Sequence, residues 1–102
     1  MVDDLSIRVT RDGSTTIVAA AGEIDISSAG DLRAAVTEAA ADCDRLRLDL
    51  TDVEFIDSTG LGGLLELRST LRARDVTLEI VAGDGPVRQA VEITGLSELL
   101  AR

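Results

Sequence analysis

The sequence predicts a single α/β domain in which helices pack on a mixed, mostly parallel β-sheet. Three observations predict this fold class. Runs of alternating apolar and polar residues, typical of strands, open the chain. A turn signal, Asp12-Gly13, separates the first two runs, and later runs alternate with segments whose apolar residues recur at helical spacing. With 102 residues, 45% of them hydrophobic, the chain is expected to form one domain over residues 1–102.

The first two strands are expected to form a hairpin. Leu5, Ile7 and Val9 alternate with polar residues, as in a half-buried strand. Asp12-Gly13 predicts a turn within a slightly longer loop. The second strand, residues 16–21, is nearly all apolar, which is typical of a central strand.

A helix is expected after the second strand. Ser27 or Ser28 could cap this helix, and Ser28 and Asp31 have the spacing of a capping box. Four apolar residues then form one stripe at helical spacing: Leu32, Ala35, Val36 and Ala39.

The remaining segments continue the alternation of strands and helices. In order, the expected elements are a strand at 46–50 extended by 53–56, a leucine-rich helix ending near Ala73, a strand at 76–80, a helix from Pro86 to Gly95 and a last helical turn at 96–100. The order β-β-α-β-α-β-α-α implies parallel βαβ units after an antiparallel hairpin. Because such crossovers are right-handed, the first two helices are expected on one face of the sheet.

Composition narrows the function classes. The formal net charge of −9 argues against nucleic acid and against an anionic membrane as partner, because both require a basic face. The charge favours a partner that carries basic groups. In the alternative interpretation, it only keeps the protein soluble. Cys43 is the only cysteine, so no intramolecular disulfide is possible and a reducing compartment is expected.

The chain is expected to be cytoplasmic and complete. It starts with Met1-Val2-Asp3-Asp4, which lacks the basic and apolar regions of a signal peptide. No apolar run approaches the length of a membrane span.

The most informative stretch is the junction at residues 55–65. An apolar run ends at Asp57, Ser58 and Thr59 follow, and glycines then open a leucine-rich helix. This order presents a hydroxyl at a helix N-terminus with little side-chain bulk beside it. In a sheet of this kind, the loops after the C-terminal ends of the strands are where ligands and partners usually bind.

Ser58 has a structural and a functional interpretation. In the structural one, Ser58 or Thr59 only caps the helix, which contributes roughly 1 kcal/mol. In the functional one, Ser58 belongs to a site that also contains Asp57 and Asp25. Asp25 leaves the second strand at what should be the same end of the sheet, so these residues could share one acidic patch.

The glycines favour the functional interpretation. Gly60, Gly62 and Gly63 lie in the first turns of the helix, where each interior glycine costs about 1 kcal/mol relative to alanine. Such a cost indicates close backbone approach, by a partner or by packing.

Enzymatic interpretations of Ser58 are weak. A nucleophile elbow needs glycine two residues before the serine, where this chain has Ile56, and a catalytic triad needs histidine, which is absent. A phosphate-binding P-loop needs lysine, which is also absent. Asp25 and Asp57 could hold Mg²⁺, but we expect no catalytic, cofactor-binding or metal residues.

With these residues in place, the chain resembles STAS domains, and within that family the free-standing anti-sigma factor antagonists. The resemblance spans nearly the whole chain, and the Asp-Ser-Thr-Gly-Leu-Gly string in this order of elements is its most specific part. The matching segments are Gly22-Glu23-Ile24-Asp25 with Ala29 and Leu32-Arg33, Leu48-Asp49-Leu50, residues 55–62 and Gly95-Leu96.

The resemblance implies a function by partner exchange. Family members of this kind bind an anti-sigma factor that is also an ATP-dependent serine kinase, and binding frees a sigma factor. The kinase phosphorylates the serine after the aspartate, which matches Ser58, and a phosphatase restores the binding form. The partner-binding residues implied here are Asp25, Asp57, Ser58, Thr59, Gly60, Leu61, Gly62 and Gly63.

Two alternatives remain open from the sequence. The chain could be a STAS interaction subunit of another machine, such as a lipid-transport complex or a signalling scaffold. A small enzyme that uses Ser58 is the second alternative, against which the missing histidine and lysine count.

Overall fold

The computed structural model describes residues 5–101, which form one four-stranded sheet with helices packed on it. Strands β1 (Leu5–Asp12) and β2 (Thr15–Ile24) are antiparallel and form the predicted hairpin. Only Gly13 and Ser14 connect them, so the expectation of a longer loop was wrong. Gly13 has φ 65°, a left-handed conformation that glycine adopts without steric cost.

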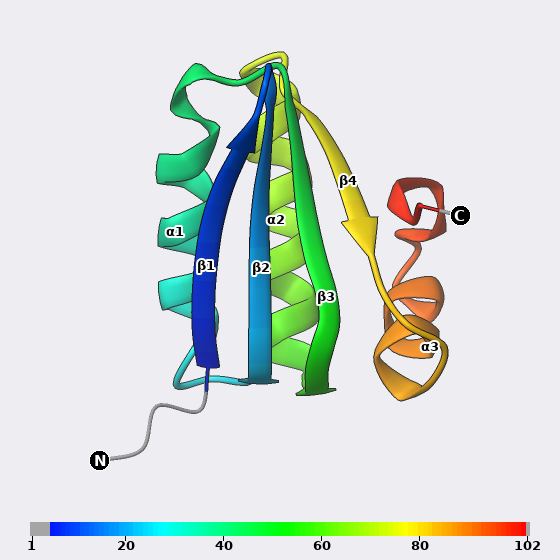
Figure 1. Ribbon diagram of the computed structural model, residues 1–102. Helices are drawn as coiled ribbons and strands as arrows, with labels where there is room; N and C mark the ends of the chain where they lie inside the picture. The colour runs from blue at the N-terminus through cyan, green and yellow to red at the C-terminus, as the bar shows by residue number, and fades with distance from the viewer. Residues whose placement is uncertain (1–4, 102) are drawn as a thin grey trace.

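The two following strands are parallel to β2, as predicted. Strand β3 (Arg45–Ile56) pairs with β2, and the short β4 (Thr77–Val81) pairs with the first half of β3, which gives the strand order β1-β2-β3-β4. Helices α1 (Ala29–Ala39) and α2 (Ser58–Ala73) lie side by side on one face of this sheet (Figure 1). A 3₁₀ turn, η1 (Ala40–Asp42), ends the α1 segment.

The C-terminal segment covers the part of the core that the short β4 leaves open. Helix α3 (Pro86–Ile93) lies beyond the β4 edge, with Val87 and Val91 buried (Figure 1). A 3₁₀ turn, η2 (Ser97–Leu99), follows it. Leu100 then bridges to Ile80, and the Ala101 amide donates to the Ile80 carbonyl at 2.8 Å, so residues 100 and 101 pair with β4.

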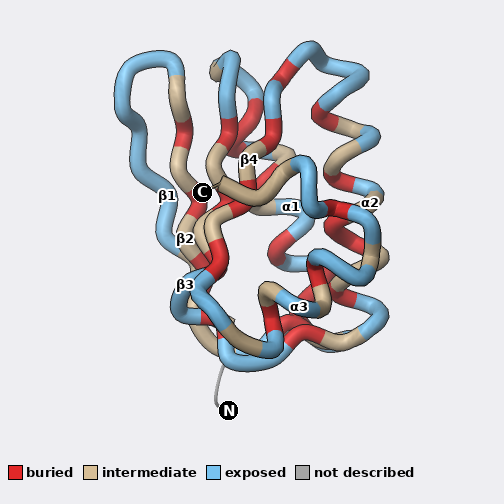
Figure 2. Tube along the Cα trace, turned by 90° about the vertical axis from the view of Figure 1, so that its right-hand side faces the viewer, coloured by how far each residue is buried: buried red, intermediate tan, exposed pale blue. Residues whose placement is uncertain are grey.

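The core lies between the sheet and the helices, and it is almost entirely aliphatic. Buried positions recur along β2, β3, β4 and the helices, whereas β1 has no buried residue (Figure 2). The side chains least exposed to solvent come from all layers: Val18, Ile24, Val36, Leu46, Leu48, Leu50, Leu64, Leu67, Leu71, Ile80, Val91 and Leu96. On the opposite face of the sheet, the Arg47 Nε pairs with the Glu79 Oε1 at 2.7 Å.

Strand β3 departs from strict alternation of buried and exposed residues after Leu50. The pairing with β2 shifts register after Ala19 and again after Gly22, so β3 contains extra residues. Buried residues consequently follow at a spacing of three rather than two, from Leu50 to Val53 to Ile56. The shifts keep Asp52 and Glu54 out of the core, because strict alternation from Leu50 would have buried both.

Ser28 does not cap α1 through its side chain, contrary to the capping-box prediction. It occupies the N-cap position, but its hydroxyl donates to the Glu23 carbonyl at 2.9 Å and accepts from the Asp25 amide at 3.0 Å. The side chain is therefore used to hold the β2–α1 loop. None of the helices within residues 5–101 is long and apolar enough to cross a membrane.

Candidate functional site

The junction between β3 and α2 is built around Asp57. This residue has an extended backbone (φ −99°, ψ −175°), so the helix begins immediately after it. Its carboxylate Oδ1 accepts a hydrogen bond from the Gly60 amide at 2.9 Å, which satisfies one of the free amides of the first turn. The capping residue is therefore Asp57, and the structural interpretation in which Ser58 or Thr59 caps α2, one of the two left open by the sequence, is wrong.

Because Asp57 caps the helix, the Ser58 side chain is not needed as a cap. Ser58 is the first residue of α2, and both Ser58 and Thr59 are exposed. Within residues 5–101 the Ser58 hydroxyl makes no hydrogen bond, so it is available to another molecule. The simplest structural explanation for this serine is thereby removed.

The ends of β2 and β3 meet at this junction. Ile24 pairs with Ile56, and the Asp57 amide donates to the Ile24 carbonyl at 3.1 Å. Asp25 and Asp57 each follow one member of that pair, so they leave the sheet at the same end, as the sequence predicted. This end also holds the start of α2 (Figure 1).

The Asp25 carboxylate is occupied within its own loop. Its Oδ1 accepts from the Ser27 hydroxyl at 2.6 Å and from the Ser27 amide at 2.9 Å. The hydrogen bond from the Ser27 hydroxyl, followed by that from the amide, lowers the pKa of Asp25 below its ordinary value. The carboxylate therefore stays charged at neutral pH, and its role in the described structure is to order the loop.

Gly60 is required by internal packing. A Cβ on Gly60 would lie 2.7 Å from Ile24 Cγ2 and 2.7 Å from Ile56 Cγ1, and 3.1 Å from the Ile24 carbonyl oxygen. These atoms belong to buried residues at the ends of two paired strands, so they cannot move aside easily. Close packing of α2 on the sheet thus explains this glycine without a partner.

Gly62 and Gly63 have no such explanation. A Cβ at either position would meet no atom within 4 Å. Their cost inside α2, about 1 kcal/mol each relative to alanine, is therefore not offset by packing within the domain. Leu61, between Gly60 and Gly62, is half-buried and packs against the core. Gly62 is partly exposed, so a surface that needs little side-chain bulk remains the reason for Gly62, whereas Gly63 is buried.

The structure adds two exposed apolar residues that the expected partner-binding set did not include. Ile26, in the loop between Asp25 and Ser27, is 81% exposed, and Phe55, at the end of β3, is 48% exposed. Both flank the same end of the sheet. In the sequence, Ile26 could have been found as an isoleucine isolated among polar loop residues. Phe55 could have been found from the interrupted alternation of apolar and polar residues in β3.

Asp25 and Asp57, the two carboxylates considered for Mg²⁺, are both engaged within the domain. Asp57 and Asp25 each use one carboxylate oxygen locally, on Gly60 and Ser27. Within residues 5–101, no group of three or more His, Cys, Asp or Glu side chains is placed to hold a metal ion.

Comparison with protein families matches residues 6–101 to the STAS domain. The chain belongs to the STAS family. Its curated relatives include the anti-sigma-B factor antagonist of Listeria monocytogenes, which is 34% identical over 103 residues that cover 95% of this chain and 87% of the relative. The anti-sigma-B factor antagonist of Staphylococcus aureus is 30% identical over 98 residues, covering 95% of this chain and 91% of the relative.

Solved structures of anti-sigma factor antagonists share the fold of this chain. An anti-sigma factor antagonist from Mycobacterium paratuberculosis superposes with a TM-score of 0.84 at 29% identity, covering 94% of this chain and 82% of that one. The anti-sigma factor antagonist SpoIIAA in its unphosphorylated form gives a TM-score of 0.80 at 19% identity, covering 94% of this chain and 86% of that one. The latter similarity concerns the fold alone.

Proposed function

We propose that this STAS domain is an anti-sigma factor antagonist that binds an anti-sigma factor while Ser58 is unphosphorylated. One observation carries the proposal: Asp57 caps α2, and the exposed Ser58 hydroxyl is left without a hydrogen bond in the described structure. The full-length relatives named as anti-sigma-B factor antagonists support the same conclusion. The chain acts by binding and by being modified, and catalysis is left to its partner.

The partner docks on the start of α2. The floor of the contact is formed by Leu61 and Gly62, both partly exposed, and their buried neighbours Gly60 and Gly63 add no side chain to it, so a partner can approach closely. Thr59 contributes an exposed hydroxyl beside Ser58.

Charge and apolar contacts surround this floor. Asp25 and Asp57 supply negative charge at the same end of the sheet, which favours a partner with basic groups. Ile26 supplies apolar area next to them, because its side chain is 81% exposed in the isolated domain. An apolar contact beside charged groups is typical of specific interfaces.

The switch is phosphorylation of Ser58 by an anti-sigma factor that is itself a serine kinase, and a serine phosphatase reverses it. Phosphoserine brings a charge of about −1.5 to −2 at pH 7 and three oxygen acceptors. Placed on the glycine floor, this group blocks close contact and loses its hydration on docking. The antagonist is thereby released, and the anti-sigma factor is free to bind its sigma factor.

The proposal is tested by incubating the purified chain with candidate anti-sigma factor kinases and ATP, followed by phosphopeptide mapping. We expect one phosphate, on Ser58. Ser58→Ala should remain unmodified while it still binds the kinase, and the matched variant Thr59→Ala should be phosphorylated like the wild type. A phosphate mainly on Thr59, or on another residue while Ser58 stays clean, would overturn the assignment.

A further inference from the structure

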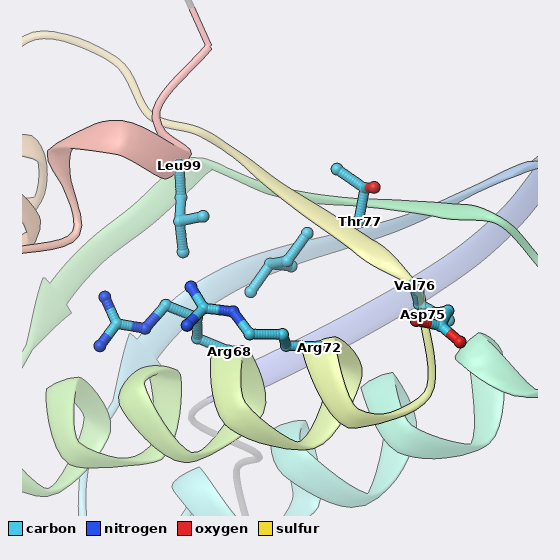
Figure 3. A pocket seen from close by; sticks show the side chains of 7 residues that line it. Arg68, Arg72, Asp75, Val76, Thr77 and Leu99 are labelled. Carbon is cyan, nitrogen blue, oxygen red and sulfur yellow. The ribbon is translucent and has the colours of Figure 1, made fainter.

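A cavity lies at the opposite end of α2 from Ser58. It is formed between the last turns of α2, the start of β4 and η2, and it has a volume of about 370 Å³. Its lining comes from three elements and the turn that joins two of them (Figure 3): Arg68, Arg72, Asp75, Val76, Thr77, Leu78 and Leu99. Small-molecule sites commonly have volumes of about 300–1,000 Å³, so the cavity is large enough for a small ligand.

The cavity has an apolar floor and a cationic wall. Val76 and Leu78 are buried, and Leu99 packs against the core from the other side. Arg68 and Arg72 lie one helical turn apart on α2, and their guanidinium groups both extend away from Asp75 (Figure 3). An apolar body would therefore contact the floor while an anionic group meets both arginines.

The positive charge of this wall is only weakly neutralised by the protein. Arg68 Nη1 reaches Glu98 Oε1 at 3.4 Å, and the Glu98 side chain is 64% exposed. An ion pair of that length with an exposed partner contributes little, about 0–1 kcal/mol. Arg72 forms no salt bridge with any residue in the range 5–101. In a chain with a net charge of −9, Arg68 and Arg72 place two positive charges beside an apolar cavity whose lining also contains Asp75.

We propose that this cavity binds a small phosphate monoester with an apolar body. Guanidinium groups bind phosphate through pairs of parallel hydrogen bonds. A monoester that is largely doubly charged at neutral pH matches two arginines, whereas a carboxylate matches only one. The proposal concerns a site separate from Ser58, so it stands or falls independently of the anti-sigma factor function.

The test is a titration of the ¹⁵N-labelled full chain with phenyl phosphate, followed by NMR amide shifts. We expect saturable shifts concentrated on Thr77, Leu78 and Leu99. Three further probes separate the chemistries: inorganic phosphate lacks the apolar body, benzoate carries a single charge, and phenol has none. Phenyl phosphate should bind at least fivefold more tightly than each of these three. Equal binding of phenol would overturn the proposal, and equal binding of benzoate would overturn its choice of phosphate.

Two variants of equal charge test the role of the arginines. Arg72→Gln should weaken phenyl phosphate binding at least fivefold. Arg74→Gln removes the same charge two residues away, outside the cavity lining, and should change the affinity less than twofold. Equal losses in the two variants would mean non-specific attraction and would overturn the proposal, as would shifts spread over the whole surface. Both arginines are exposed, so both variants should keep the wild-type spectrum elsewhere.

Discussion

The carboxylate of Asp57 accepts a hydrogen bond from the amide of Gly60 at 2.9 Å, and this bond determines what Ser58 can do. A serine before or at a helix start usually caps the helix. Here the preceding aspartate does so, and the serine is the first helical residue with an exposed side chain. The cap and the proposed phosphorylation site are thus neighbouring residues, so phosphorylation of the serine would leave the cap in place.

This division of roles predicts different costs for two alanine substitutions. Asp57→Ala should lower the free energy of unfolding by about 1 kcal/mol, because the Gly60 amide loses its acceptor. Ser58→Ala should change it by less than about 0.5 kcal/mol, as expected for an exposed residue without structural contacts. Urea denaturation of the two variants beside the wild type measures both. A larger loss for Ser58→Ala than for Asp57→Ala would mean that the serine is the structural cap.

Gly60→Ala should be destabilising by about 1–3 kcal/mol, the usual range for overpacking a well-packed core. The added Cβ would lie 2.7 Å from side-chain atoms of both Ile24 and Ile56. Gly63→Ala is the matched control on the same helix, since its Cβ meets no atom within 4 Å. This control should stabilise the domain by up to about 1 kcal/mol through helix propensity. Thermal melting distinguishes the two, and equal melting temperatures would contradict the packing role of Gly60.

Gly62→Leu should weaken partner binding much more than it affects folding. A Cβ at this position meets no atom within 4 Å in the isolated domain, whereas a leucine side chain would occupy the floor that the partner approaches. We expect at least a tenfold loss of affinity, about 1.4 kcal/mol, with circular dichroism unchanged. Gln89→Leu, an exposed change on α3, is the control for added surface hydrophobicity. If Gly62→Leu binds the anti-sigma factor normally, the contact surface lies elsewhere.

The pKa of the Asp25 carboxyl should be found below its ordinary value of about 4, because Ser27 donates two hydrogen bonds to the charged form. A pKa that is lower in the folded than in the unfolded state adds stability above the unfolded pKa, and that stability is lost as pH falls through the folded pKa. The contribution of the Asp25–Ser27 hydrogen bonds to the stability of the domain is therefore expected to be lost only below about pH 4.

Ser27→Ala tests the cause of this shift, since it removes the hydroxyl donor and keeps the amide donor. The pKa of Asp25, followed by NMR of its carboxyl carbon, should rise part of the way towards the ordinary value. A midpoint that does not move in this variant would contradict the assigned cause.

The sequence was sufficient to predict α2 closely, and the reason is local. Helix α2 spans Ser58–Ala73, in agreement with the predicted helix, because the polar junction and the leucine periodicity mark its two ends independently. The strand order and the placement of α1 and α2 followed from chain connectivity and crossover handedness, which depend little on side-chain detail.

Side-chain hydrogen bonds were predicted less well, because several donors and acceptors compete over short distances. Ser28 had the spacing of a cap but binds Glu23 and Asp25 across the loop instead. Asp57 has the backbone conformation to cap α2, which sequence spacing alone could not distinguish from capping by Ser58. The roles of Gly60 and Gly62 also looked equivalent, and only the three-dimensional packing separates them.

The central claim is that phosphate on Ser58 acts at the interface and leaves the fold intact. Phosphoserine at a helix N-terminus gains about 0.3–1 kcal/mol from the helix dipole. The Asp57 carboxylate opposes it across solvent, where screening is strong. These contributions are small and opposite in sign, so they should leave the melting temperature within about 4 °C of its original value.

The most direct measurement is a pair of titrations of the anti-sigma factor with unphosphorylated and Ser58-phosphorylated protein, with melting curves on the same samples. We predict an affinity loss on the order of a hundredfold, about 2.7 kcal/mol, at nearly unchanged melting temperature. Equal affinities of the two forms, or unfolding of the domain by phosphorylation alone, would contradict this account.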